Sequence, residues 1–146
     1  MLVRDMLKSS PHKIITVSPK TSVLKAMETL ISNKIGCLPV LDSKGVLVGI
    51  LDDQDIFRAV YENQDEFEKF TASDLMTSDL IIGMPNDDLN YIAGLMAKNR
   101  IHYVPIMEDK KMIGLISPGD VVKAQMTHIE TENRYLKMYM DGMHQG

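Results

Sequence analysis

The sequence is poor in several residue types on which particular classes of protein depend. Its 146 residues include one cysteine, Cys37, and no tryptophan. A single cysteine excludes an internal disulfide and a cluster of thiolates around zinc. No apolar run approaches the roughly 18 residues that cross a bilayer, and Asp5 stands where a signal peptide would be apolar. We therefore expect a cytoplasmic protein without a membrane partner.

The chain also lacks a large excess of charge of either sign. The formal net charge is −4, and lysine and arginine are scattered along the chain instead of forming basic blocks. This distribution argues against nucleic acid as a partner. With 45% hydrophobic residues, the chain can nevertheless bury a core of ordinary size.

Signatures of catalysis are missing as well. The sequence has no glycine-rich P-loop, no HExxH and no recognisable Ser-His-Asp arrangement. Cys37 lies in an apolar run without a marked partner, which favours a small core residue over a nucleophile. Methionine is a flexible core filler, so we expect no metal site in the tail that contains Met138, Met140, Met143 and His144.

What the sequence does contain is one pattern that occurs twice. Residues 35–55 read IGCLPVLDSKGVLVGILDDQD, and residues 101–120 read IHYVPIMEDKKMIGLISPGD. Pro39 matches Pro105, and Gly49 matches Gly114. The agreement extends upstream through a strand and a helix, with shifts of register only in two loops. Such agreement in the spacing of apolar residues and in the positions of proline and glycine indicates an internal repeat.

Each copy predicts the order strand, helix, strand, strand, helix after a short helical lead-in. In the first copy, β-branched residues 14–17 predict a strand that ends at Ser18-Pro19, and an amphipathic helix follows with Thr21 or Ser22 as its N-cap. Apolar runs at residues 37–41 and 46–51 flank a turn that contains Gly45, which predicts a hairpin. We place the first repeat at residues 1–62, a connector at 63–71 and the second repeat at 72–127.

A long terminal helix is predicted after the second repeat, with an extension over residues 128–146. Its stripe consists of Val122, Met126, Ile129, Asn133, Leu136 and Met140, at helical spacing, and Gly142 is its expected end. A stripe that outlasts its own repeat needs a cover, either the first repeat or another subunit.

The two copies together resemble a pair of CBS domains, the Bateman module, over about residues 2–126. The resemblance implies an α/β (α+β) fold of tandem βαββα repeats with pseudo-two-fold symmetry. It also implies clefts between the repeats for an adenine nucleotide, with AMP expected first and ADP or ATP as alternatives. Because members of this family commonly form dimers, we expect a homodimer to which the terminal helix contributes.

The segment Ser117-Pro118-Gly119-Asp120 has two interpretations. It is a good helix start, with Ser117 as N-cap and Asp120 reaching back in a short capping box, and this needs no ligand. By resemblance, Asp120 also holds a ribose and Ser117 lies near a phosphate. The complete main site implied by the resemblance consists of Ser18, Val23, Ile35, Gly36, His102, Tyr103, Leu115, Ser117 and Asp120.

A second site follows from the repeat, and it departs from the family pattern. Asp52 stands where a hydroxyl residue is expected, and its carboxylate repels a phosphate. We therefore expect this site to be weak, empty or used differently. Its implied residues are Met84, Leu89, Ile101 and His102 together with Gly36, Cys37, Ile50, Asp52 and Asp55.

The sequence thus favours a regulatory nucleotide sensor that has no catalytic activity or catalytic cofactor and that acts on a separate protein. One alternative is an interaction module or scaffold with vestigial clefts. The other is a nucleotide-processing enzyme, for which we find no base, metal cluster or nucleophile.

Overall fold

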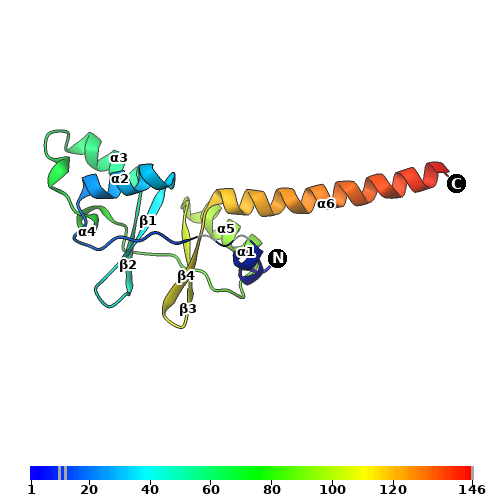
Figure 1. The fold of residues 1–146 in the computed structure, drawn as a ribbon, viewed down its shortest axis with the longest axis horizontal. Helices are drawn as coiled ribbons and strands as arrows, with labels where there is room; N and C mark the ends of the chain where they lie inside the picture. The colour runs from blue at the N-terminus through cyan, green and yellow to red at the C-terminus, as the bar shows by residue number, and fades with distance from the viewer. Residues whose placement is uncertain (10, 12, 146) are drawn as a thin grey trace.

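The computed structural model describes residues 1–9, 11 and 13–145, and Figure 1 shows the arrangement of their elements. The fold mixes helices and short strands, with the same order in both halves and a long helix at the C-terminus, which confirms the predicted fold class. The elements are α1 (Val3–Ser9), α2 (Val23–Asn33), β1 (Cys37–Leu41), β2 (Leu47–Asp52), α3 (Asp53–Glu62), a 3-10 turn η1 (Phe67–Lys69), α4 (Ala72–Leu75), α5 (Leu89–Asn99), β3 (Val104–Glu108), β4 (Lys111–Ile116) and α6 (Pro118–Gln145).

The two hairpins form as predicted. β1 pairs with β2 and β3 pairs with β4, both antiparallel, and each has one irregularity, after Val40 and after Ile106. The positive φ angle of Gly45 (79°) permits the first turn, whereas Asp109 and Lys110 take positive φ in the second, shorter turn.

The strands predicted at the start of each repeat are reduced to single parallel bridges, Val17 to Val40 and Gly83 to Ile106. The backbone N–H of Val17 donates to the carbonyl of Pro39, and that of Leu41 donates to the carbonyl of Val17, both at 3.0 Å. The next rungs of this ladder would need N–H donors from Pro39 and Pro19, and proline has none. The prediction of a full strand at residues 14–17 is therefore wrong, and prolines at matched positions limit the second repeat in the same way.

Helices α2 and α5 begin and end alike. Ser22 is the N-cap of α2, one of the two residues expected there, and its side chain accepts from the backbone N–H of Lys25 at 3.2 Å. Both helices end on a basic residue in the left-handed conformation, Lys34 (φ 54°) and Arg100 (φ 53°). These two cations therefore occupy equivalent places, a few residues before β1 and β3.

Each repeat has its own hydrophobic core. The short helix that precedes each repeat in the sequence, α1 or α4, packs against the core of the other repeat. Val3 and Met6 of α1 lie in the core of the second repeat with Ile92 and Ile106. Ala72 of α4 lies in the core of the first repeat. In Figure 1, α1 accordingly lies beside α5 and far from α2. The chain between α1 and α2 must cross from one repeat to the other.

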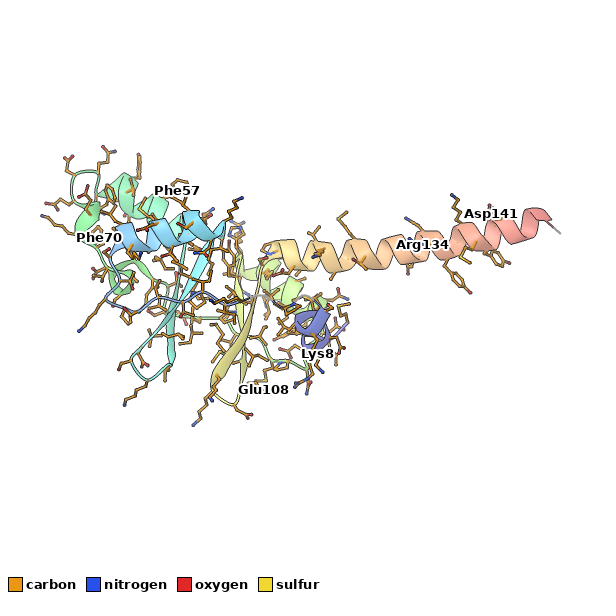
Figure 2. The ribbon with its side chains drawn as sticks, viewed as in Figure 1. Lys8, Phe57, Phe70, Glu108, Arg134 and Asp141 are labelled. Carbon is orange, nitrogen blue, oxygen red and sulfur yellow. The ribbon has the colours of Figure 1, made fainter. Side chains whose placement is uncertain are left out.

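Helix α6 begins in the second core, where Val121 is buried, and then projects away from the rest of the molecule (Figures 1 and 2). The expected end at Gly142 is wrong, because α6 continues to Gln145. A glycine inside a helix costs about 1 kcal/mol and does not end the helix by itself. The side chains of Ile129, Met143 and His144 lie outside the described part of the structure. Within the described residues, no helix is long and apolar enough to span a membrane.

Candidate functional site

Two cavities are lined by residues from both repeats. The larger, which we call the Asp120 cavity, has a volume of about 460 Å³, and the smaller, the Asp55 cavity, has about 260 Å³. Small-molecule sites typically measure roughly 300–1,000 Å³. Size alone therefore favours the Asp120 cavity as the one that can enclose a nucleotide.

The Asp120 cavity ends at the start of α6, where Ser117 and Asp120 form a reciprocal cap. The backbone N–H and the hydroxyl of Ser117 donate to Oδ2 of Asp120 at 2.8 and 3.0 Å, and the N–H of Asp120 points to the Ser117 hydroxyl at 3.4 Å. These bonds fix the carboxylate in the cavity wall. A carboxylate offers about four acceptor sites, so capping does not exhaust its capacity for hydrogen bonds.

Gly36 and Tyr103 bring the two repeats together between the cavities. A Cβ atom on Gly36 would collide with the hydroxyl of Tyr103, so only glycine allows this approach. Tyr103 lines both cavities. Burial, followed by the charge of Asp53, raises the pKa of its hydroxyl to about 12, which keeps the hydroxyl neutral. A side chain of the other repeat, Tyr103, therefore occupies the space beside Gly36.

The Asp55 cavity has the same kind of cap, built from two carboxylates. Asp52 N–H donates to Oδ2 of Asp55 at 3.0 Å, and Asp55 N–H donates to Oδ1 of Asp52 at 2.9 Å. Thr77 donates its hydroxyl to Oδ1 of Asp55 at 3.4 Å. Burial, followed by the neighbouring charge and side chain of Asp52, raises the pKa of Asp55 to about 6, although its backbone hydrogen bond opposes the shift.

Most of the residues predicted for the main site meet in the Asp120 cavity: Ile35, Gly36, Tyr103, Leu115, Ser117 and Asp120. Three others lie elsewhere. Val23 is fully buried in the first core, because the backbone of this residue is tied to Phe70 and its side chain faces inward. Ser18 is exposed and bonded to Thr21, and His102 lines the Asp55 cavity.

The second predicted site is brought together less completely. Ile50, Asp52, Asp55, Ile101 and His102 line the Asp55 cavity, whereas Gly36 lines the Asp120 cavity. Leu89 is buried in the second core, the counterpart of Val23 in the first. Met84 is exposed, and Cys37 belongs to the wall of the Asp120 cavity. Burial, followed by the charges of nearby aspartates, raises the pKa of the Cys37 thiol, which fits a core residue and not a nucleophile.

Sequence reasoning missed the segment that crosses between the repeats. Lys13, Ile14 and Ile15 line the Asp120 cavity, and the matching residues Asp79, Leu80 and Ile81 line the Asp55 cavity. A signal was present, since residues 14–17 were recognised as an apolar segment before a matched proline. We interpreted this apolar segment as a core strand, because the spacing of apolar residues does not show that the chain crosses from one repeat to the other here.

Charge distinguishes the two cavities. The Asp120 cavity contains two lysines, Lys13 and Lys34, with Asp120 as the one carboxylate among its lining residues. The lining of the Asp55 cavity contains three carboxylates with two arginines: Asp52, Asp55, Asp79, Arg58 and Arg100. At the matched positions 13 and 79, a cation faces one cavity and an anion the other. The balance of charge among the lining residues therefore favours an anionic ligand in the first cavity over the second.

The raised pKa of Asp55 gives a prediction for stability. Asp55→Asn should raise the melting temperature at pH 8, and the gain should shrink as pH falls through 6 toward 4. The native state takes up a proton at about pH 6, but the unfolded chain does so only near the ordinary value of 3.8. As pH rises from about 4 to 6, ionisation of Asp55 therefore lowers the free energy of unfolding of the wild type. The Asp55→Asn variant has no such loss. Thermal unfolding at pH 8 and pH 5 measures the difference.

Asp74→Asn is the matched control, because Asp74 closes an exposed capping box with Thr71 at the start of α4. An equal gain in melting temperature for Asp55→Asn at both pH values would contradict the raised pKa of Asp55.

Comparison with known proteins identifies the family. Residues 3–62 and 72–127 each match the family model for the CBS domain. YhcV of Bacillus subtilis, a CBS domain-containing protein, is 31% identical over 117 residues, which cover 80% of this chain and 81% of that protein. The chain spans about half (47%) of a longer protein of Methanocaldococcus jannaschii, which is 24% identical over 136 residues and 90% of this chain.

Solved structures agree with this match. A CBS-domain containing protein from Agrobacterium tumefaciens is 32% identical with a TM-score of 0.82, covering 86% of this chain and 99% of that one. CBSX2 in complex with AMP is 29% identical with a TM-score of 0.72, covering 86% and 96%. A CBS domain pair in complex with 5′-methylthioadenosine and S-adenosyl-L-methionine is 29% identical with a TM-score of 0.78, covering 88% and 98%. The chain therefore belongs to the CBS-domain family and carries two CBS domains in tandem.

Proposed function

We propose that this chain is a cytoplasmic regulatory module that binds an adenine nucleotide in the Asp120 cavity, performs no chemistry on it, and controls a separate protein. The contrast between the two cavities carries this proposal. The larger one combines one fixed carboxylate with two lysines and apolar walls, whereas the smaller one has three carboxylates beside its two arginines.

The lining residues divide by chemistry in a way that suits a nucleoside monophosphate. Asp120 accepts hydrogen bonds from the two ribose hydroxyls. Lys13 and Lys34 supply positive charge for the phosphate, and the hydroxyl of Ser117 lies at the start of α6, where a helix favours an anion. Ile35 and Leu115 offer apolar surface to the adenine.

The ligands of the relatives support the same assignment. AMP, 5′-methylthioadenosine and S-adenosyl-L-methionine, which are bound by two of the similar structures, share an adenosine group. They differ in charge beyond it, since AMP is anionic and S-adenosyl-L-methionine carries a sulfonium cation. Two lysines in the wall favour the anionic member, so AMP is the first candidate, with ADP and ATP as alternatives.

Thermal shift and calorimetry with AMP, ADP, ATP, NADH and S-adenosyl-L-methionine test the proposal. We expect AMP to bind in the micromolar range, about −8 kcal/mol. At a hundredfold excess over Kd it then stabilises the protein by about 2.7 kcal/mol. If none of the five raises the melting temperature, the clefts are vestigial and the module is a scaffold. Turnover of any of them would indicate an enzyme.

Regulation also requires a recipient. Only a difference in nucleotide affinity between two states of the module can drive a switch, so the regulated protein must contact a surface that differs between those states. We further propose that the chain acts as a homodimer.

A further inference from the structure

The projecting part of helix α6 is the feature of the molecule that its own fold does not explain. The helix has 28 residues, which corresponds to about 42 Å. Its start is anchored by Val121, but residues 132–142 are all exposed (Figure 2, near the labels Arg134 and Asp141). A helix without tertiary contacts is marginal in water, and stability comes from packing of its apolar face. We therefore expect this segment to pack against the surface of a partner.

The order of apolar residues along α6 specifies what that surface is. The stripe residues follow one another at alternating steps of four and three, at positions 122, 126, 129, 133, 136 and 140, and Met143 continues the spacing in the sequence. This is a heptad repeat sustained for three heptads, with 126, 133 and 140 at a and 122, 129, 136 and 143 at d. Val122, Met126, Leu136 and Met140 are all more than half exposed. A heptad seam packs against another helix in a coiled coil.

Asn133 is the polar member of the seam, and it lies at an a position. A single Asn at a costs stability but favours two parallel strands in register, because the two amides then bond to each other across the axis. No such bond forms if the helices are antiparallel or shifted. The occupant that this residue fits is a second copy of the same helix.

Charge beside the seam agrees with that occupant. Glu132 lies at g and Lys137 at e of the following heptad. In a parallel, in-register pair, g of one helix faces this e position of the other. Glu132 therefore meets Lys137 of the partner subunit, and symmetry repeats the contact. Two complementary pairs flank the Asn133 layer.

From these observations we infer that residues 122–143 of α6 form a parallel two-stranded coiled coil with a second copy of this chain, registered by Asn133. The inference deepens the proposed homodimer and is independent of nucleotide binding. It places the self-association outside the two CBS repeats, at the C-terminal side of the second one.

Light scattering of the full chain at micromolar concentration provides the first test. Leu136→Glu places two carboxylates face to face in the seam and should raise the dimer dissociation constant at least about 100-fold. Met138→Glu is the matched control, because Met138 lies at f, on the opposite side of the helix, and is also more than half exposed. Both variants should keep the melting temperature of the CBS repeats and the affinity for AMP.

Orientation is tested by cross-linking. Cys37 is buried, so a second cysteine can be introduced without interference. Met140→Cys at an a position should form an intersubunit disulfide under mild oxidation, since equivalent a positions in a parallel pair approach within disulfide range. Met138→Cys should not. In addition, Glu132→Lys and Lys137→Glu should each weaken the dimer, and an equimolar mixture of the two should recover it.

The outcomes separate the proposals. A wild-type monomer at micromolar concentration would overturn both the homodimer and the coiled coil. A dimer unaffected by Leu136→Glu but dissociated by Phe57→Ala/Tyr61→Ala, which alters an exposed face of α3, would overturn the coiled coil alone. A dimer that depends on Leu136 without cross-linking at position 140 would overturn the parallel register.

Discussion

Asp120→Ala is expected to weaken AMP binding about 100-fold or more, whereas Asp55→Ala should leave it within a few fold. Hydrogen bonds to a charged group contribute roughly 1.5–3 kcal/mol each, and the Asp120 carboxylate is assigned two from the ribose. Ser117→Ala should have a smaller effect, and the double variant Ser117→Ala/Asp120→Ala should lose measurable binding. Isothermal calorimetry with AMP measures all four proteins.

Asp55→Ala is an unusually close control for this experiment. Asp55 and Asp120 occupy the same position in matched capping boxes, each accepting from the backbone N–H three residues earlier. Both substitutions therefore remove a cap of about 1 kcal/mol from a helix start. A difference between them reports on the ligand and not on the helix. Wild-type affinity in Asp120→Ala, or a larger loss in Asp55→Ala, would reverse the assignment of the two cavities.

Local features of the fold could be predicted because local chemistry determines them. Ser22 caps α2 as expected, and both hairpins have the predicted partners. The same prolines that revealed the repeat explain why the strand at residues 14–17 is reduced to one bridge. That outcome required the pairing partner to be known, since Pro39 interrupts the ladder from the opposite side.

The site was predicted less completely because its walls come from a crossing of the chain. Val23 and Leu89 begin their helices at equivalent places, and both face the cores instead of the cavities. The cavities are lined instead by residues 13–15 and 79–81. Their approach depends on α1 and α4 docking on opposite repeats, which hydrophobic periodicity does not encode. Asp52 signalled the asymmetry between the cavities, and Lys13 and Asp79 now extend it.

The docking of α1 itself can be tested at Gly114. A Cβ atom placed there would lie 2.7 and 2.9 Å from the methyl carbons of Leu7 on α1, so Gly114→Ala should overpack this contact. Overpacking costs about 1–3 kcal/mol, and we expect the lower end of that range because the atoms in the way are the end of the flexible Leu7 side chain. Because Leu7 and Gly114 both line the Asp120 cavity, the same substitution should also weaken AMP binding. Urea unfolding and calorimetry on one set of proteins measure the two effects.

The effect of Gly114→Ala should also be measured in a protein that carries Leu7→Ala. With the methyl groups gone, Gly114→Ala no longer meets an obstacle. Alanine is favoured over glycine in a strand by roughly 0.5–1 kcal/mol, so the substitution should become neutral or stabilising. Its sign thus depends on a residue 107 positions away in the sequence. An equal cost in both backgrounds would mean that Gly114 is required by the backbone of β4 and not by the helix from the other end of the chain.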